Sequence, residues 1–209
     1  MRSGSDRFLL ATRSTDKLAE IRAIFPVRLR AALLSLDDIG LQPAALEDEI
    51  EVYETFAENA LAKAAFFRRE TGLPTIADDS GLLVPALGGR PGVRSKRFAG
   101  RGDLGGRELD EANNAALLTA LRAVPKEHRS ACYVCAAVLV GTAAPIIAFG
   151  TTAGVILDAP VGNGGFGYDP LFFHPGIGRT FGEIAGPAKH AMSHRGRAFR
   201  ALSVMVGGI

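Results

Sequence analysis

The stretch that most constrains the fold is residues 130–157, a run of 28 residues without a charged side chain. A run of this length has to be weighed as a membrane-spanning helix, which takes about 20 apolar residues. Glycine, threonine and proline residues from Gly141 onward divide it into pieces of strand length with turn residues between them. We therefore expect two buried β-strands, at about residues 131–140 and 146–151, and no membrane span.

The N-terminal residues predict a strand, a turn and a helix. Phe8 to Thr12 form a short apolar run that is typical of a buried strand. Behind a Ser/Thr cap, Leu18, Ile21 and Phe25 then recur at helical spacing. Because the first turn of a helix has free backbone N–H groups, this helix start is a natural seat for an anion.

A second helix and a second strand follow. Thr55 and Glu58 have the spacing of a capping box, and Gly72 stands where the helix that they begin should end. Residues 75–77 then predict a short strand that ends in Asp78-Asp79-Ser80-Gly81. Strands that alternate with helices in this way indicate an α/β fold.

Glycine is frequent and unevenly distributed. The chain has 25 glycines in 209 residues, nine of them in residues 72–106 and eleven in residues 141–186. Glycine turns the backbone tightly, or lets it approach a ligand closely, without the steric cost of a side chain. These two windows are therefore where we expect a functional site.

Asp78 and Asp79, in the first window, are the strongest site candidates. Two acids at the carboxyl edge of a strand lie where open α/β sheets collect their ligands. Adjacent carboxylates supply oxygen ligands for a hard metal ion, with a spare carboxylate to orient or deprotonate a water. Glu51 or Glu54 could add a further ligand. The alternative is that the two aspartates merely cap a helix or a turn.

Charged residues gather in blocks. From Ala31 to Ala62 there are acids but no Lys or Arg, and beyond Glu183 there are bases but no acid. These blocks are either solvated faces or a polyanion site in which acids hold a metal and bases hold phosphates. Likewise, Ser193–Arg197 is either a solvated turn or a source of planar donors for a nucleobase or a phosphate.

Other common motifs fail or are absent. Gly162–Gly167 matches G-x-G-x-x-G, but Pro170 follows where a dinucleotide site requires a helix. There is no Walker A loop and no H-E-x-x-H motif. Cys132 and Cys135 are expected to point to opposite faces of a strand, so packing explains them better than zinc does. Two thiols and the lack of a signal peptide at the start favour a reducing, cytoplasmic location.

Six short segments occur along the chain in a fixed order and together form a recognisable set. They are Leu10–Lys17 (LATRSTDK), Thr55–Ala60 (TFAENA), Ala77–Leu82 (ADDSGL), Leu87–Val93 (LGGRPGV), Gly165–Pro170 (GFGYDP) and Ser193–Gly196 (SHRG). The set resembles the inosine triphosphatase or Ham1-like family, which hydrolyses non-standard purine nucleoside triphosphates. The resemblance spans about Phe8 to Leu202, nearly the whole chain.

The resemblance implies a fold and an activity. The fold is a single α/β domain over residues 1–209, two-lobed, with a mixed central β-sheet flanked by helices. The activity is hydrolysis of ITP, dITP or XTP to the nucleoside monophosphate and pyrophosphate, with Mg²⁺, by a cytoplasmic homodimer. No nucleic acid or membrane is implied as a partner.

The resemblance also assigns residues to roles. The triphosphate would be seated by Thr12, Arg13, Ser14, Thr15, Asp16, Lys17 and Lys63. The metal would be held by Glu51 and Asp79, water would be activated by Asp79 with Asp78, and Ser80 would touch substrate. The base pocket would be formed by Phe166, Gly167, Tyr168, Asp169, Lys189, His194 and Arg195. The first block departs from the family, which usually has Gly-Asn or Arg-Asn where this chain has Arg13-Ser14.

Two other functions remain open at this point. A nucleotide sensor or nucleic-acid binder would use the basic residues without turnover, and its affinity would depend strongly on salt. A Maf-like pyrophosphatase that acts on modified pyrimidine nucleotides would share the first and third blocks. The products formed from a panel of nucleotides would distinguish all three.

Overall fold

The computed structural model describes residues 7–44, 46–47, 50–141 and 143–206. Asp48 and Glu49, two acids of the block between Ala31 and Ala62, lie outside the described residues. Within the described ranges, no helix combines the length and the apolar character needed to cross a membrane.

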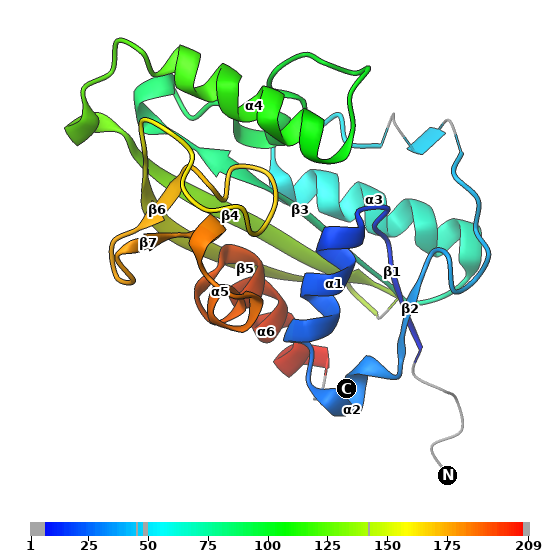
Figure 1. The fold of residues 1–209 in the computed structure, drawn as a ribbon. Coiled ribbons are helices and arrows are strands. Elements are labelled where there is room, and N and C mark those ends of the chain that lie inside the picture. The colour runs from blue at the N-terminus through cyan, green and yellow to red at the C-terminus, as the bar shows by residue number, and fades with distance from the viewer. Residues whose placement is uncertain (1–6, 45, 48–49, 142, 207–209) are drawn as a thin grey trace. The chain divides into compact units, whose positions relative to one another are not determined.

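The strands form one mixed sheet (Figure 1). They are β1 (Phe8–Leu10), β2 (Leu33–Ser35), β3 (Thr75–Leu83), β4 (Ser130–Val140), β5 (Ile146–Ile156), β6 (Phe172–His174) and β7 (Arg179–Thr180). Their order is β2-β1-β3-β4-β5-β6-β7. β1 is parallel to β2 and β3, whereas β6 is antiparallel to β5 and β7. The predicted α/β class with a mixed sheet and flanking helices is therefore confirmed.

The chain divides into two compact units. Unit 1 comprises Met1–Asp79, Cys135–Gly150 and Arg195–Ile209, and unit 2 comprises Ser80–Val134 and Thr151–His194. Three long strands, β3, β4 and β5, contribute residues to both units.

Unit 1 contains α1 (Thr15–Ile24), α2 (Val27–Arg30), α3 (Phe56–Thr71) and nearly all of α6 (His194–Val206). The predicted caps are present. The Ser14 side chain accepts from the Lys17 N–H at the start of α1, and the Thr55 side chain accepts from the Glu58 N–H at the start of α3. Gly72 ends α3 with a φ of 71°, a left-handed conformation that favours glycine.

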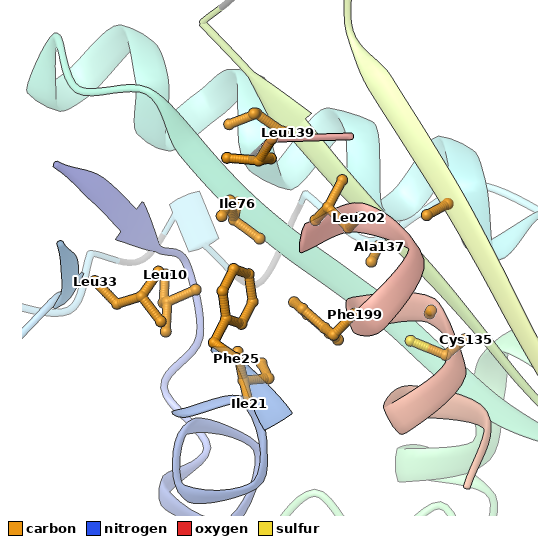
Figure 2. Close-up of a cluster of buried hydrophobic side chains, with 13 residues drawn as sticks. Leu10, Ile21, Phe25, Leu33, Ile76, Cys135, Ala137, Leu139, Phe199 and Leu202 are labelled. Carbon is orange, nitrogen blue, oxygen red and sulfur yellow. The ribbon is translucent and has the colours of Figure 1, made fainter. Parts of the chain in front are cut away.

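Side chains of α1 and α6 share a core with the sheet in unit 1 (Figure 2). Ile21 packs there with Ile76 of β3 and Phe199 of α6. The Phe25 and Phe199 rings meet edge to face, with centroids 5.9 Å apart. Burial of two large aromatic rings in one cluster fixes where both helices lie on the sheet, since truncating such a ring costs about 3–5 kcal/mol.

Unit 2 has its own core and its own helices. These are α4 (Gly106–Ala120) and α5 (Gly186–Met192), with short 3₁₀ turns η2 (Pro85–Leu87), η3 (Gly92–Arg97), η4 (Lys126–His128) and η5 (Phe181–Glu183). Leu117 of α4 is buried in one cluster with Tyr133 of β4, Phe172 of β6 and Phe181. The Tyr133 and Phe172 ring centroids are 4.6 Å apart, so aromatic packing dominates this core.

Two strands, β3 and β5, are longer than expected from the sequence, and β5 runs to Ile156 rather than ending near residue 151. The prediction that the strand beginning at residue 75 ends at residue 77 is wrong, because β3 continues through Asp78 and Asp79 to Leu83 alongside β4. What ends at this point is β1, whose last residue, Leu10, is level with Ile76. The two acids therefore lie just beyond the carboxyl end of β1, in the middle of a longer neighbouring strand.

The C-terminal segment forms two helices, α5 and α6. The extended backbone of Ser193 (φ −67°, ψ 155°) ends α5, and α6 begins at the next residue. Arg195 in the first turn of α6 is only 2% exposed, so the interpretation of Ser193–Arg197 as a solvated turn is wrong.

Candidate active site

Asp78 and Asp79 face opposite sides of β3. Successive residues of a strand point to opposite faces. Ile76 packs in the core with α1 and α6, and Asp78, two residues later, contacts residues of those same helices. Asp79 instead contacts α3. Two adjacent carboxylates thus have different surroundings.

Asp78 is buried among cations. Its Oδ2 lies 3.2 Å from Lys17 Nζ of α1 and 3.3 Å from Arg195 Nε of α6. The Cys135 thiol of β4 is 3.9 Å from the same oxygen. The other side of the Arg195 guanidinium donates from Nη1 to Glu20 Oε2 at 2.6 Å. Side chains of α1, α6 and β4 thus meet at a single buried carboxylate of β3.

These cations keep Asp78 ionised. Burial alone would raise the pKa of Asp78, because a low-dielectric interior disfavours a charge. The positive charges of Lys17, Arg195 and Lys63 outweigh burial and hold that pKa well below its usual range. Arg195 shows the matching effect. Burial opposes the charge of its guanidinium, but Asp78 and Glu20 raise the pKa of Arg195.

The pKa of Asp79 is shifted in the opposite direction. Its pKa is raised above the usual range, first by burial and in part by the negative charges of Glu51 and Asp78. Asn59 of α3 donates from Nδ2 to Asp79 Oδ2 at 3.1 Å. A buried carboxylate with a raised pKa is a better proton acceptor near neutral pH than an ordinary aspartate. Of the two acids, Asp79 is therefore better suited to act as a base.

Glu51 lies near this acid and is paired with Lys63 of α3. Burial would raise the pKa of Glu51, but Lys63 overcomes that effect and lowers it. Lys63 has a raised pKa in turn, because Glu51 and Asp78 outweigh the effect of burial. Both side chains are therefore charged, and Glu51 contributes an anionic oxygen pair close enough to Asp79 to affect its titration.

The residues predicted to hold a metal fit such a role. No group of three or more His, Cys, Asp or Glu side chains among the described residues is arranged to hold a metal ion alone. Mg²⁺ does not require one, since it commonly uses one or two carboxylates and completes its shell with water and substrate phosphates. Burial first, and the charge of Glu51 in part, raise the pKa of Asp79, and a cation held by the two carboxylates would offset their negative charge.

The predicted phosphate seat is the turn between β1 and α1. Ser14 caps the helix through the Lys17 N–H, and its own N–H donates to Thr12 Oγ1 at 3.2 Å. Thr15 and Asp16 are exposed in the first turn of α1. Arg13 points elsewhere, because its guanidinium forms a bidentate pair with Glu47, at 3.0 and 2.7 Å. Of the cations in this block, Lys17 is the one that joins the buried cluster.

A second group of predicted residues forms a tight turn in unit 2. The Phe166 N–H donates to Asp169 Oδ2 at 2.9 Å, and Asp169 is paired with Lys189 of α5. The Lys189 ammonium lies 4.7 Å from the centroid of the Phe166 ring, a cation–π contact. Gly165 has a φ of 69°, and a Cβ there would come within 2.0 Å of Asp169, so only glycine fits.

Two side chains of helix α4 bind the backbone of the same turn. The Gly167 N–H donates to Asp110 Oδ2 at 2.7 Å, and its carbonyl accepts from Asn114 Nδ2 at 2.9 Å. These two side chains are four residues apart, so they share one face of the helix. The turn that presents Phe166 is therefore fixed at both backbone groups of Gly167.

The remaining predicted base-pocket residues differ in how they are placed. Tyr168 is buried in the core of unit 2, and its hydroxyl donates to the Ser95 carbonyl at 2.8 Å. The ring of His194 stacks on Tyr133, with centroids 4.5 Å apart. Ser80 begins the unit 2 part of β3 and is half-buried. Arg195 is in the unit 1 cluster with Asp78, so its contact with a base stays a prediction.

Comparison with known proteins identifies the family of this chain. Residues 8–205 match the profile of the Ham1 family. The chain belongs to the Ham1 family. It is 48% identical to the dITP/XTP pyrophosphatase of Frankia alni over 201 residues, which cover 96% of both chains. A relative of the same name from Geobacter sulfurreducens is 48% identical over 202 residues, again covering 96% of both.

Solved structures of Ham1 proteins share the fold. A HAM1 protein from Coxiella burnetii superimposes with a TM-score of 0.82 at 35% identity, covering 97% of this chain and 99% of that one. A nucleoside-triphosphatase / dITP/XTP pyrophosphatase from Mycobacterium abscessus gives a TM-score of 0.70 at 41% identity, covering 94% and 98%. The resemblance inferred from six short segments is therefore confirmed over nearly the full length.

Several residues that contact the candidate site residues were not predicted from the sequence. They are Glu20, Asn59, Asp110, Asn114, Tyr133 and Cys135. Glu20 had a signal, because it lies three residues after Lys17 on the same face of α1. Asn59 lies in the segment Thr55–Ala60, one of the six that carry the resemblance, but no role was assigned to it. Nothing in the sequence places Cys135 beside Asp78, since only the sheet brings the two residues together.

Proposed function

We propose that this chain hydrolyses dITP, XTP and ITP to the nucleoside monophosphate and pyrophosphate. The observation that carries the proposal is the pair Asp78 and Asp79, adjacent in β3, of which Asp78 lies against Lys17 and Arg195 and Asp79 lies against Asn59. One carboxylate stays ionised among cations and the other is ready to accept a proton. Relatives that are 48% identical over almost the whole chain are named dITP/XTP pyrophosphatases.

Mg²⁺ is the proposed cofactor, held by Glu51 and Asp79. Bound there, it would offset triphosphate charge and polarise the phosphoryl oxygens. Lys63 would then exchange part of its contact with Glu51 for a contact with the phosphates. Lys17 and the N–H groups at the start of α1 would bind the same phosphates, because a helix start and an ammonium both favour anions.

The proposed reaction is attack of water on the α-phosphorus. Asp79, assisted by Asp78, accepts a proton from the water as its oxygen bonds to phosphorus. The bond between the α-phosphorus and the oxygen that bridges to the β-phosphorus then breaks, and pyrophosphate leaves. Arg195 contributes by keeping Asp78 charged, and a direct contact of Arg195 with substrate remains part of the proposal.

The unit 2 residues are proposed to bind the base. The Phe166 ring offers a stacking surface, and Gly167, Tyr168 and Asp169 shape the turn that presents it. Lys189 and His194 supply donors that suit the 6-oxo group of hypoxanthine or xanthine better than the amino group of adenine. A site whose buried donors are left unpaired by the wrong base discriminates strongly.

A panel of nucleotides with Mg²⁺ tests this function. ITP, dITP, XTP, ATP, GTP and a modified pyrimidine triphosphate would be incubated with the protein and the products identified. We expect pyrophosphate from the first three and little product from ATP. Orthophosphate would indicate a different phosphatase, turnover of the pyrimidine would favour a Maf-like activity, and binding without product would favour a sensor.

We also propose that the chain acts as a cytoplasmic homodimer. Light scattering after size-exclusion chromatography would give twice the 22.0 kDa chain mass if it does. A mass equal to one chain at micromolar concentration would contradict the dimer without affecting the proposed reaction.

A further inference from the structure

Asn59, in the first turns of α3, is one of the most buried polar side chains in unit 1, with 1% of its surface exposed. It makes three hydrogen bonds. Its Oδ1 accepts from the Tyr53 N–H at 2.9 Å, and its Nδ2 donates to the Tyr53 carbonyl at 3.1 Å and to Asp79 Oδ2 at 3.1 Å. Both amide protons are therefore used.

These partners fix the orientation of the amide. If the Asn59 side chain were flipped, its oxygen would face the Tyr53 carbonyl and the Asp79 carboxylate, and its nitrogen would face an N–H. Each of these pairings is repulsive. The side chain can therefore satisfy Tyr53 and Asp79 together in only one orientation.

The contacts of Asn59 join two predicted metal ligands that come from separate parts of the chain. Tyr53 lies two residues after Glu51, in a segment without helix or strand. Lys63, four residues after Asn59 and thus on the same face of α3, pairs with Glu51 itself. One helix face therefore anchors the Glu51 segment at two points and contacts Asp79 at a third.

We infer that Asn59 is a positioning residue that sets the distance and orientation of Glu51 relative to Asp79 for the metal. This inference rests on the proposed function, because it assigns Asn59 a part in that same site. A ligand's hydrogen-bond partner typically affects metal affinity or activity by 10- to 100-fold.

The chain offers a matched control for this residue. Asn113 in α4 is also buried, accepts from the Ala99 N–H at 2.8 Å and donates to the Lys96 carbonyl at 3.1 Å. It makes the same two-point contact with a backbone as Asn59 makes with Tyr53. Asn113→Ala therefore controls for the loss of a buried asparagine with two backbone hydrogen bonds at a place remote from Glu51 and Asp79.

Two readouts would be taken on the full chain. The first is kcat for ITP at saturating Mg²⁺, and the second is the affinity for Mn²⁺ without nucleotide, from the loss of the free-ion electron paramagnetic resonance signal. We expect Asn59→Ala to lower kcat and to weaken Mn²⁺ binding by about 10- to 100-fold each. Asn113→Ala should stay within about threefold of the unmodified protein in both.

Each outcome decides the matter. Equal losses in the two variants, or no loss in Asn59→Ala, would overturn the inference, because the role would then be general packing or none. If Asn59→Ala does not fold, the milder Asn59→Ser is judged by the same criteria, and failure of both to fold would assign Asn59 to structure alone. An unmodified protein without turnover would instead refute the proposed function.

Discussion

The two groups of predicted site residues, one in each unit, are built in different ways. In unit 1, side chains hold other side chains: Asp78 is fixed by Lys17 and Arg195, and Asp79 by Asn59. In unit 2, side chains hold a glycine turn by its backbone, through Gly167 and its partners in α4. The candidate residues of unit 1 thus set the charge of two carboxylates, whereas those of unit 2 set the shape of a turn, with the buried Asp169–Lys189 pair beside it.

The largest expected effect is a loss of activity when a carboxylate of the unit 1 group, Asp79, is replaced. Asp79→Asn removes the proposed base but keeps the size of the side chain, so kcat for ITP should fall by about 10²- to 10⁴-fold. Circular dichroism and thermal unfolding would check that the fold is intact. A rate near that of the unmodified protein would remove Asp79 from the mechanism.

The next effect is on stability. Arg195→Met leaves Asp78 and Glu20 buried without their shared guanidinium, which should cost about 3–5 kcal/mol in the free energy of unfolding. Urea denaturation would measure it. As a control, Arg22→Met removes a largely exposed partner of Asp38 and should cost less than about 1 kcal/mol. Similar losses in both variants would show that the buried cluster is not specially important to the fold.

Substitutions in the unit 2 group around Phe166 should mainly affect substrate binding. Phe166→Ala removes the proposed stacking surface and should weaken ITP binding by about 1–3 kcal/mol, seen as a higher KM with a smaller change in kcat. Phe149→Ala, at an exposed ring of β5, is the matched control and should leave both constants unchanged. A fall in kcat alone for Phe166→Ala would contradict the division between the two units.

The smallest effect tests the helix start. Ser14→Ala and Thr55→Ala each remove an N-cap and should each cost about 1 kcal/mol of stability, measured by thermal unfolding. If Ser14 also seats the triphosphate, only Ser14→Ala should raise the KM for ITP as well. Equal KM values for the two variants would restrict Ser14 to its role as a cap.

The sequence predicted local features well because they depend on near neighbours. The caps at Ser14 and Thr55 and the left-handed Gly72 all follow from residues within one turn of the helix. The end of the strand at Asp78 was misplaced, because a strand ends where its pairing ends. That pairing depends on β4, more than 40 residues further along the chain.

The sequence named the candidate site residues but not how those residues pair with one another. The six segments identified the family and most of the charged residues. They did not show that Arg195, 117 residues after Asp78 and 175 after Glu20, binds both acids. They also did not show that Arg13 is turned toward Glu47. Such pairings depend on how helices lie on the sheet, which no local pattern records.

The sequence by itself thus determined the family and the α/β class, and it singled out Asp78 and Asp79 as the candidate acids. Only the tertiary structure decided that the pKa values of these adjacent acids shift in opposite directions. Alternation along β3 turns Asp78 toward the cations of α1 and α6, and Asp79 toward α3 and the negative charge of Glu51. A pKa depends on burial and on charges within a few ångströms, and residues far apart in the sequence supply both.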